Sequence, residues 1–462
     1  MVGLHGTTNL ATPPAIALLR NAEDVVVEGI RISGPGVGIA VVNAKVTVRR
    51  TEVRKTAVFG VVVQGTGSVA TIESTLIADT QPRPNSQEQG YALHVRQGGT
   101  ATILRSAVLR SRAVALFAAG LGTTISVENS VISDTLPQAS DLALGIGVAS
   151  IEGAAATVRD SAVVGNRSYG AHSLGKGSSL NVVRSLIANT AIQESDKRFG
   201  GGLGIAAGTT AAMTRTILAD TLLDPTQLYG VGLLVSDGAD VETSDCTVVR
   251  NRSTGVLATD PGTWVRTTGT LIADTFEATK PLSLGRGMDV SAGARADIVG
   301  SAILRSVEGG IHARGGNTLV SVDASLISDT MAQTTGHLLG QGVSVNRAAK
   351  GVVTGSVVRR SQHSGVSTLA SNGLAIERSL ILDTRPTFDE TYGVGLVCAL
   401  SPVTVKRTII ADSHTAGVLL VPCEGTIEES AIEGVVEGAF HRYAGPTLGQ
   451  GMVIATYGGI AD

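Results

Sequence analysis

The hexapeptide Thr75-Leu-Ile-Ala-Asp-Thr80 recurs along the chain with few changes and predicts its fold. Near-copies of it begin at Ser130, Ser185, Thr216, Thr270, Ser325 and Ser379. Between these copies lies a second version in which the small residue and the acid are replaced by Arg-Ser, Arg-Asn or Gly-Asn, as in Val108-Leu-Arg-Ser111. A chain that copies itself at such short intervals is typical of a repeat protein, in which each unit is stabilised by stacking on its neighbours.

The residue that follows the apolar triplet of each copy is polar, and in a stacked repeat these residues would form one column. Aligned on it, the copies give Asp79, Ser111, Asp134, Asn166, Asn189, Asp220, Asn251, Asp274, Ser306, Asp329, Ser361, Asp383 and Asp412. Through most of the chain the spacing alternates between about 23 and about 32 residues, so short coils alternate with coils that carry an extra loop. The alternation resets once, where the looped coils of Asn189 and Asp220 follow one another directly.

Within each repeat, short β-branched runs are separated by Gly, Asn, Asp and Ser, as in Gly99-Thr-Ala-Thr-Ile-Leu-Arg-Ser106. Runs this short indicate strands, and no segment keeps a helical period for long. Coils of about 23 residues are too short for helix crossovers, yet copies that all run in one direction must stack in parallel. We therefore predict an all-β fold, a right-handed parallel β-helix of about 16 coils, with Val, Ile and Leu pairs such as Leu76-Ile77 stacked inside.

These features resemble the right-handed parallel β-helix repeat proteins of the pectate-lyase-like superfamily over nearly the whole chain. The period, the apolar rungs and the polar column from Asp79 to Asp412 carry the resemblance, since the column is similar to the Asn and Ser ladders of those proteins. The resemblance implies a fold but no single activity, because the superfamily includes lyases, hydrolases, epimerases, adhesins and inert scaffolds. The polygalacturonase-like motifs Asn-Thr-Asp, Asp-Asp, Gly-His-Gly and Arg-x-Lys are missing, so we assign no catalytic residue.

Composition favours one continuous domain over residues 1–462, with an entry or cap at 1–27, regular coils at 28–435 and a C-terminal cap at 436–462. The chain has 58 Gly and only 3% aromatic residues, which suits a narrow core beside many tight turns. Its formal charge of −3 argues against binding to nucleic acid or an anionic membrane. No apolar run is long enough for a membrane-spanning helix. We predict an exported protein, at the cell surface or extracellular, whose signal is not in this chain.

The cysteines and histidines indicate neither a metal site nor a cofactor, because none of them has metal-ligand spacing. Cys398 and Cys423 lie about one repeat apart and could meet across stacked coils. Their offsets within the repeat differ by a few residues, which argues against a disulfide. We leave the state of this pair open.

The polar column has a structural and a catalytic interpretation. Stacked carboxylates could bind Ca²⁺ or act as acid and base. However, Asp, Asn, Ser and Thr replace one another freely along it, as expected if they only satisfy turn amides. Arg110, Arg305 and Arg360 come one place before the column in the alternate coils, where we expect exposed Arg–Asp pairs rather than a basic stripe for acidic sugars.

The loops leave the solenoid after each Asp-Thr or Asn-Thr and must emerge on one side. They tend to end in Gly-x-Gly, as in Gly145-Ile-Gly147, where we expect the glycines to permit a turn at positive φ. The two loops that follow Thr190 and Thr221 are only one coil apart and supply our candidate binding residues, Asp196, Lys197, Arg198, Phe199 and Tyr229. Aromatic rings in the loops, such as Tyr91, either form a binding face or, as we favour, cover their own loop against the sheet.

Three functions remain open. The first is a non-catalytic, exported repeat scaffold or adhesion protein that presents its row of loops to a protein or polysaccharide partner. The second is a polysaccharide lyase, hydrolase or epimerase that acts on an acidic glycan with a site between about residues 190 and 230. The third is a filament or sheath subunit that stacks end to end.

Overall fold

The computed structural model describes residues 15–195, 200–222, 230–278, 284–334, 339–388, 392–436, 450–456 and 459–460. The predicted residues Asp196, Lys197, Arg198, Phe199 and Tyr229 lie outside these ranges. The chain divides into two compact units, Met1–Gly230 and Val231–Asp462. Both units have the same plan, in which every coil gives one strand to each of three parallel sheets, A, B and C.

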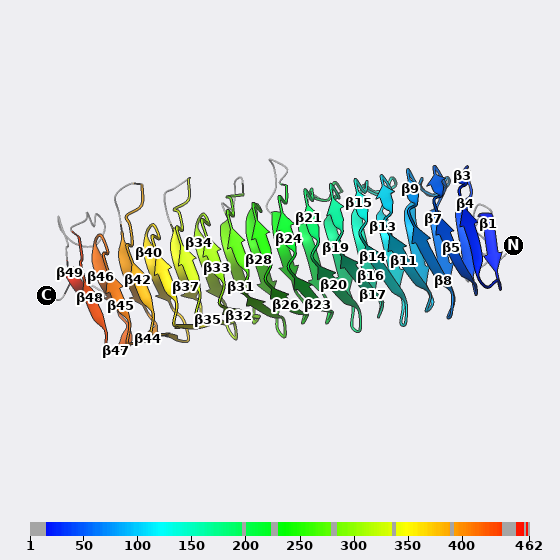
Figure 1. The fold of residues 1–462 in the computed structure, drawn as a ribbon. Helices are drawn as coiled ribbons and strands as arrows, with labels where there is room; N and C mark the ends of the chain where they lie inside the picture. The colour runs from blue at the N-terminus through cyan, green and yellow to red at the C-terminus, as the bar shows by residue number, and fades with distance from the viewer. Residues whose placement is uncertain are drawn as a thin grey trace. The chain divides into compact units, whose positions relative to one another are not determined.

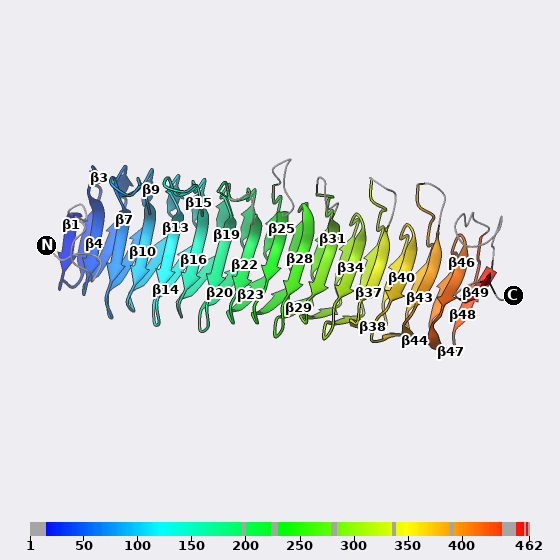
Figure 2. The ribbon, with the colours of Figure 1, turned by 180° about the vertical axis from the view of Figure 1, so that it is seen from behind.

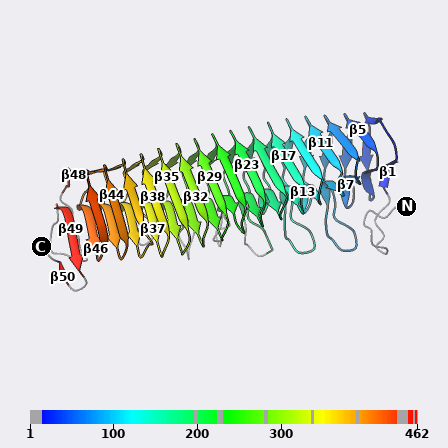
Figure 3. The ribbon, with the colours of Figure 1, turned by 90° about the horizontal axis from the view of Figure 1, so that it is seen from below.

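In the first unit, eight described coils follow one another from β1 to β24 (Figure 1, Figure 2). Sheet A consists of β1 (Ala15–Arg20), β4 (Val37–Val42), β7 (Phe59–Gln64), β10 (Tyr91–Arg96), β13 (Val114–Ala119), β16 (Ile146–Ile151), β19 (Tyr169–Leu174) and β22 (Gly201–Ala206). Sheet B consists of β2 (Val25–Glu28), β5 (Lys45–Arg49), β8 (Val69–Glu73), β11 (Thr100–Leu104), β14 (Thr124–Glu128), β17 (Ala155–Arg159), β20 (Ser179–Val183) and β23 (Thr210–Thr214). Sheet C consists of β3 (Arg31–Ser33), β6 (Glu52–Arg54), β9 (Leu76–Ala78), β12 (Ala107–Leu109), β15 (Val131–Ser133), β18 (Ala162–Val164), β21 (Leu186–Ala188) and β24 (Ile217–Ala219). In Figure 3, strands of sheet B such as β11 and β17 run in the same direction, and β14 lies between them and pairs with both.

The second unit repeats this arrangement over eight further described coils. Sheet A consists of β25 (Gly230–Val235), β28 (Ser253–Thr259), β31 (Gly285–Ser291), β34 (Gly309–Arg314), β37 (Gln341–Asn346), β40 (Ser364–Leu369), β43 (Val394–Ala399), β46 (Ala416–Val421) and β49 (Gln450–Thr456), with β50 (Gly459–Ile460) antiparallel to β49. Sheet B consists of β26 (Asp240–Ser244), β29 (Trp264–Thr268), β32 (Arg295–Val299), β35 (Leu319–Asp323), β38 (Lys350–Thr354), β41 (Leu374–Glu377), β44 (Pro402–Lys406) and β47 (Glu424–Glu428). Sheet C consists of β27 (Thr247–Val249), β30 (Leu271–Ala273), β33 (Ala302–Leu304), β36 (Leu326–Ser328), β39 (Val357–Arg359), β42 (Leu380–Leu382), β45 (Ile409–Ala411) and β48 (Ala431–Glu433).

The predicted fold class is confirmed, since the described residues form a right-handed parallel β-helix of about 16 coils without helices. The apolar core is narrower than we predicted. In each strand of sheet C only the middle residue points inward, because side chains alternate across a strand. Ile77 and Ile187 are therefore 0% exposed, whereas Leu186 beside Ile187 is 36% exposed.

The close approach of sheet A to sheet C depends on glycine. A Cβ added to Gly255 in β28 would lie 2.6 Å from the carbonyl oxygen of Gly287 and 2.7 Å from Cγ2 of Ile272. The expected role of the Gly-x-Gly pairs is therefore correct only for the first glycine of some pairs, such as Gly145, whose φ is +100°. The second glycine, Gly147, has no positive φ, and a Cβ there would lie 2.5 Å from the carbonyl oxygen of Gly170. It is required because nothing larger fits between the sheets.

The residues that we aligned as one polar column occupy two adjacent columns. Ala78 pairs with Leu109, so Asp79 lies beside Arg110 and Thr80 lies beside Ser111. One column has left-handed backbone with φ between 49° and 59° and contains Asp79, Asp134, Asn189, Asp220, Asp274, Asp329, Asp383 and Asp412, with Lys55, Arg110, Arg250, Arg305 and Arg360 between them. The other is buried and contains Ser111, Asn166, Asn251, Ser306 and Ser361, with the Thr or Ser that follows each Asp or Asn of the first column. Aligning Ser111 with Asp79 in the sequence puts Val108 opposite Leu76, which is wrong by one residue. The middle residue of each triplet points inward, so Val108 pairs with Ile77.

Two cysteines form a disulfide that we had argued against. The bond joins Cys398 to Cys423, whose Cα atoms are 5.9 Å apart. Pro402 pairs with Glu424, so Cys423 lies beside Ser401 at the corner between sheets A and B. A side chain at this corner reaches back to β43, which is why unequal offsets within the repeat do not prevent the bond. Cys246 is buried and is not part of this disulfide.

Candidate functional site

The described loops of the first unit are hydrogen-bonded to one another and form a layer of their own. This loop layer consists of residues 81–90, 136–145 and 191–195. The amide of Gln89 donates to Oε1 of Gln138, and the amide of Leu144 donates to Oε1 of Gln193, each at 3.2 Å. Both bonds link residues 49 positions apart, so successive loops repeat the same contact.

Backbone hydrogen bonds strengthen this layer with the same regularity. Ser140 donates through its amide to the carbonyl of Gln87 at 3.0 Å, and Ser195 donates to the carbonyl of Leu142 at 3.1 Å. A loop whose neighbours fix it on both sides loses little conformational entropy when it binds a partner. The loop layer is therefore a preorganised surface.

Aromatic side chains fill the outer face of sheet A where the first loop enters it. The ring centroid of Phe59 lies 5.8 Å from that of Tyr91 and 5.1 Å from that of His94. The ring centroid of Phe117 lies 5.2 Å from those of both Tyr91 and His94. His94 is only 5% exposed although it points away from the solenoid core. Burial, with a smaller effect of Glu88, raises the pKa of Tyr91 to about 12. The ring of Tyr91 thus packs on the sheet, as we favoured from the sequence.

The second unit has charged side chains on the corresponding face. Arg286 and Asp289 of β31 meet Glu308 at the entry to β34, and His312 and Arg314 follow in β34. We call these five residues the charged cluster. Nη1 of Arg286 lies 2.7 Å from Oδ2 of Asp289, and its Nε lies 2.9 Å from Oε1 of Glu308. The side chains of Arg286, Asp289 and Glu308 are at most 9% exposed.

Electrostatics in the charged cluster keep Asp289 ionised and His312 neutral. Burial opposes ionisation of Asp289, but the contact with His312 and the charges of Arg286 and Arg314 outweigh it and lower its pKa to about 2. Burial lowers the pKa of His312 and outweighs the contact with Asp289, whose Oδ1 lies 3.5 Å from its Nδ1. A neutral imidazole beside an ionised carboxylate can accept or transfer a proton.

The loop that ends at Gly340 is hydrogen-bonded to the charged cluster and to the preceding loop. The amides of Gly340 and Gln341 donate to the carbonyl of Glu308 at 2.8 and 3.0 Å. In the preceding loop, Oε1 of Glu277 accepts a hydrogen bond of 2.9 Å from the amide of Thr334. Glu308 itself has a left-handed backbone with φ of 77°, which directs its carboxylate toward Arg286.

Sequence reasoning missed the charged cluster, although one signal was present. The strand Gly285-Arg-Gly-Met-Asp289 corresponds to Gly230-Val-Gly-Leu-Leu234 in an earlier looped coil. A direct comparison of these two copies would have shown charged residues at the positions of Val231 and Leu234. Contact with Glu308 could not be foreseen, because only the register of the coils brings it beside Arg286.

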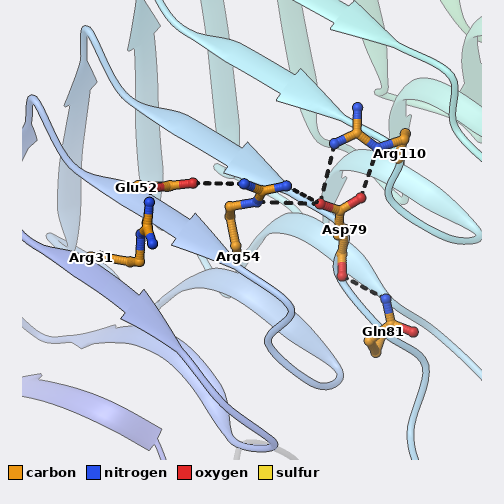
Figure 4. A network of polar contacts seen from close by, with 6 residues as sticks. All are labelled: Arg31, Glu52, Arg54, Asp79, Gln81 and Arg110. Atoms are coloured by element: carbon orange, nitrogen blue, oxygen red, sulfur yellow. Dashed lines mark hydrogen bonds and ion pairs between the residues drawn. The ribbon is translucent and has the colours of Figure 1, made fainter.

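The predicted Arg–Asp pairs form along the left-handed column. Nε of Arg110 lies 2.7 Å from Oδ1 of Asp79, and corresponding pairs join Arg305 to Asp274 and Arg360 to Asp329. Asp79 also contacts Arg54 of the preceding coil, so a chain of ion pairs runs from Arg31 through Glu52 to Arg110 (Figure 4). The hydrogen bond from Arg110 is the main cause of a lowered pKa at Asp79. Because the arginines are exposed, each pair stabilises the fold only slightly.

A hydroxyl ladder at the corner between sheets B and C was also missed. The amide of Thr75 donates to Oγ of Ser106 at 3.0 Å, and the amide of Ser106 donates to Oγ of Ser130 at 3.0 Å. Its described members are Thr51, Thr75, Ser106, Ser130, Ser161, Ser185, Thr216, Cys246, Thr270, Ser301, Ser325, Ser356, Ser379, Thr408 and Ser430. In the looped coils, the ladder residue is the Ser or Thr that opens the repeated hexapeptide. This recurring hydroxyl residue is the signal from which the ladder could have been predicted.

Metal binding finds no support in the part of the chain that the structure describes. Within those ranges, no three His, Cys, Asp or Glu side chains are grouped so that they could hold an ion. The described residues likewise include no helix long and apolar enough to cross a membrane.

Comparisons with known proteins agree with the fold. A family model described as a right-handed β-helix region matches residues 15–187. The match agrees with the right-handed parallel β-helix fold of the described residues. No curated protein sequence matches it.

Several solved structures are similar at low identity. The structure of the Vag8–C1 inhibitor complex has a TM-score of 0.40 and 14% identity, covering 96% of this chain and 99% of that chain. Pectate lyase Pel9A has a TM-score of 0.31 and 11% identity, covering 63% of this chain and 68% of its own. The A-module of mannuronan C-5 epimerase AlgE6 from Azotobacter vinelandii has a TM-score of 0.26 and 11% identity, covering 91% of each chain.

Proposed function

We propose that this protein is an exported β-helix scaffold that binds a protein partner through the loop layer of its first unit. The observation that carries the proposal is the lateral hydrogen bonding of the loops, repeated between Gln89 and Gln138 and between Leu144 and Gln193. Rigid loops on a regular scaffold are typical of binding surfaces. Export is supported by the disulfide between Cys398 and Cys423, since such bonds persist in oxidising compartments.

Exposed leucines in the loop layer favour a protein over a polysaccharide. Leu136 is 36% exposed and Leu142 is 48% exposed, and both are held by a fixed backbone. Apolar side chains on a preorganised surface gain most by burial against another protein. The same layer contains the uncharged polar residues Gln87, Gln138 and Gln193, which take part in the bonds between the loops.

Retention on immobilised ligands tests this proposal. Extracellular-matrix proteins, serum proteins and polysaccharides are presented separately to the purified protein. We expect saturable retention on at least one protein, reduced at least about tenfold by Leu136→Asp with Leu142→Asp. The matched control is Leu121→Asp, since Leu121 is 84% exposed in the turn between β13 and β14, outside the loop layer.

Three results contradict the proposal. They are equal loss of retention in the loop variant and the control, retention on polysaccharides alone, and the absence of retention on any protein. Melting temperatures of both variants show whether the fold is preserved.

A second candidate function is an enzyme acting on an acidic polysaccharide, as a lyase, hydrolase or epimerase. The observation that favours it is the charged cluster, where neutral His312 and ionised Asp289 lie beside Arg286 and Arg314. In such an enzyme, Arg314 would bind an acidic group of the glycan and His312 would transfer the proton. Incubation with pectate and alginate measures the activity: absorbance for new double bonds detects a lyase, a reducing-end assay detects a hydrolase, and NMR of the uronic-acid residues detects an epimerase.

Two sets of variants distinguish the two possible positions of the active site, the charged cluster and the predicted loop. His312→Ala removes the activity if the charged cluster is the site. Alanine at Asp196, Lys197 or Arg198 removes it if the site lies in the predicted loop instead. Failure of the wild-type protein to act on any acidic polysaccharide rejects both.

A further inference from the structure

The disulfide closes one complete coil of the second unit into a covalent ring. Cys398 is in β43 and is 0% exposed, and Cys423 follows the end of β46, 25 residues later. Between them the chain passes through β44, β45 and β46. The bond therefore joins the sheet A strand of one coil to the end of the same strand in the next.

Cys423 stands where a row of corner hydroxyls would continue. At the corner between sheets A and B, the amide of Gly238 donates to Oγ1 of Thr263 in the next coil, and the amide of Gly293 donates to Oγ1 of Thr318. The amide of Ser371 likewise donates to Oγ of Ser401 at 2.9 Å. Cys423 lies beside Ser401 in register, so at the next position in this row a covalent bond replaces the hydroxyl contact.

The coil beyond Cys423 buries little apolar surface. In β44 and β45 the inward residues Val405 and Ile410 are 0% exposed. The corresponding residues Ile427 in β47 and Ile432 in β48 are only half-buried, and Glu424 and Thr426 are exposed. A segment with few buried apolar side chains opens at low free-energy cost unless another constraint holds it.

We propose that the disulfide is a redox-dependent clamp that keeps the coil formed by β46, β47 and β48 closed in an oxidising compartment and lets it open in a reducing one. A dithiol reductant supplies two electrons and two protons, the S–S bond breaks, and both cysteines become thiols while the dithiol becomes a cyclic disulfide. An oxidant such as a protein disulfide reverses the step. The clamp lies in the second unit and does not depend on partner binding by the loop layer.

Hydrogen exchange measured by mass spectrometry tests the clamp. The oxidised protein is compared with the same protein reduced by dithiothreitol and with the reduced protein after reoxidation. We expect amides in β46, β47 and β48 to exchange on the order of 100-fold faster after reduction, because Cys423, at the start of the weakly buried segment, is then no longer anchored to the buried Cys398. Amides in β31 and β34 of the same unit serve as the internal reference and keep their rates.

Cysteine variants assign the effect to this bond. Cys398→Ser with Cys423→Ser should show the fast exchange without reductant and no further response to it, whereas Cys246→Ser should respond as the wild type does. Unchanged exchange in β46 to β48 after complete reduction overturns the proposal. An equal increase along the whole unit also overturns it, because opening would then be global. If the double variant does not fold, the exchange rates of the wild-type protein after reduction and reoxidation still show whether the disulfide acts as the clamp.

Discussion

The amide of Thr75 donates a hydrogen bond of 3.0 Å to the hydroxyl of Ser106, which occupies the same corner of the next coil. Both residues are at least nine-tenths buried, so water cannot replace this bond. We predict that Ser106→Ala lowers the free energy of unfolding by about 1–3 kcal/mol, because it leaves a buried donor without an acceptor. Urea denaturation measures the change. Ser126→Ala on the outer face of sheet B is the control and should cost less than about 0.5 kcal/mol; equal costs would contradict the role of the ladder.

The glycines at the close approach of sheets A and C give a second prediction. Gly255→Ala should cost about 3 kcal/mol, because the new Cβ meets the carbonyl of Gly287 and the side chain of Ile272, and both belong to packed strands. Gly316→Ala is the matched control, since nothing lies within 4 Å of a Cβ there and its φ is not positive. The control should be neutral or slightly stabilising. Comparable losses for the two substitutions would show that the sheets can separate to admit a methyl group.

The sequence determines the architecture because the repeat displays the alternation of side chains many times over. Each copy has a β-branched residue in the middle of a three-residue strand, as at Ile77 and Val108, and this suffices to predict parallel stacking. The register was harder to predict. Asp79 and Thr80 are adjacent and both polar, so the sequence does not indicate which of them faces inward. Only the paired strands show that Thr80 does.

The candidate site was less accessible to sequence reasoning. Ion pairs between Asp79 and Arg110 could be predicted because both residues follow the repeat. The charged cluster could not, since it consists of departures from the repeat at Arg286, Asp289 and Glu308, which the coils bring together. The predicted binding residues from Asp196 to Phe199 and Tyr229 lie outside the described ranges and stay a prediction.

Two arginines allow a comparison of exposed and buried ion pairs. Arg110→Met should cost less than about 1 kcal/mol, and the cost should fall further at high salt, because its side chain is 45% exposed. Arg286→Met should cost about 3–5 kcal/mol, because it leaves Asp289 and Glu308 buried without their cation. Urea denaturation at low and high salt measures both. Similar costs for the two variants would mean that the charged cluster is hydrated in solution.

Acid stability provides a test of the charges around Asp289. Its pKa of about 2 in the folded protein lies below the ordinary value of about 3.9, so the folded state binds a proton less readily than the unfolded state. The resulting stabilisation, about 2 kcal/mol, is fully present above the unfolded pKa and is lost as the pH falls from about 4 toward 2. In Asp289→Asn the decline of stability over this interval should be shallower by that amount.

The control for this measurement is Glu424→Gln, which changes an exposed carboxylate of β47 and should leave the acid decline as in the wild type. Stability is followed by urea denaturation at several pH values, so a variant that is less stable at neutral pH still yields a slope. If Asp289→Asn and the wild type decline in parallel between pH 4 and pH 2, Asp289 is not held ionised by Arg286, His312 and Arg314. The charged cluster would then lack the fixed negative charge on which its proposed proton transfer depends.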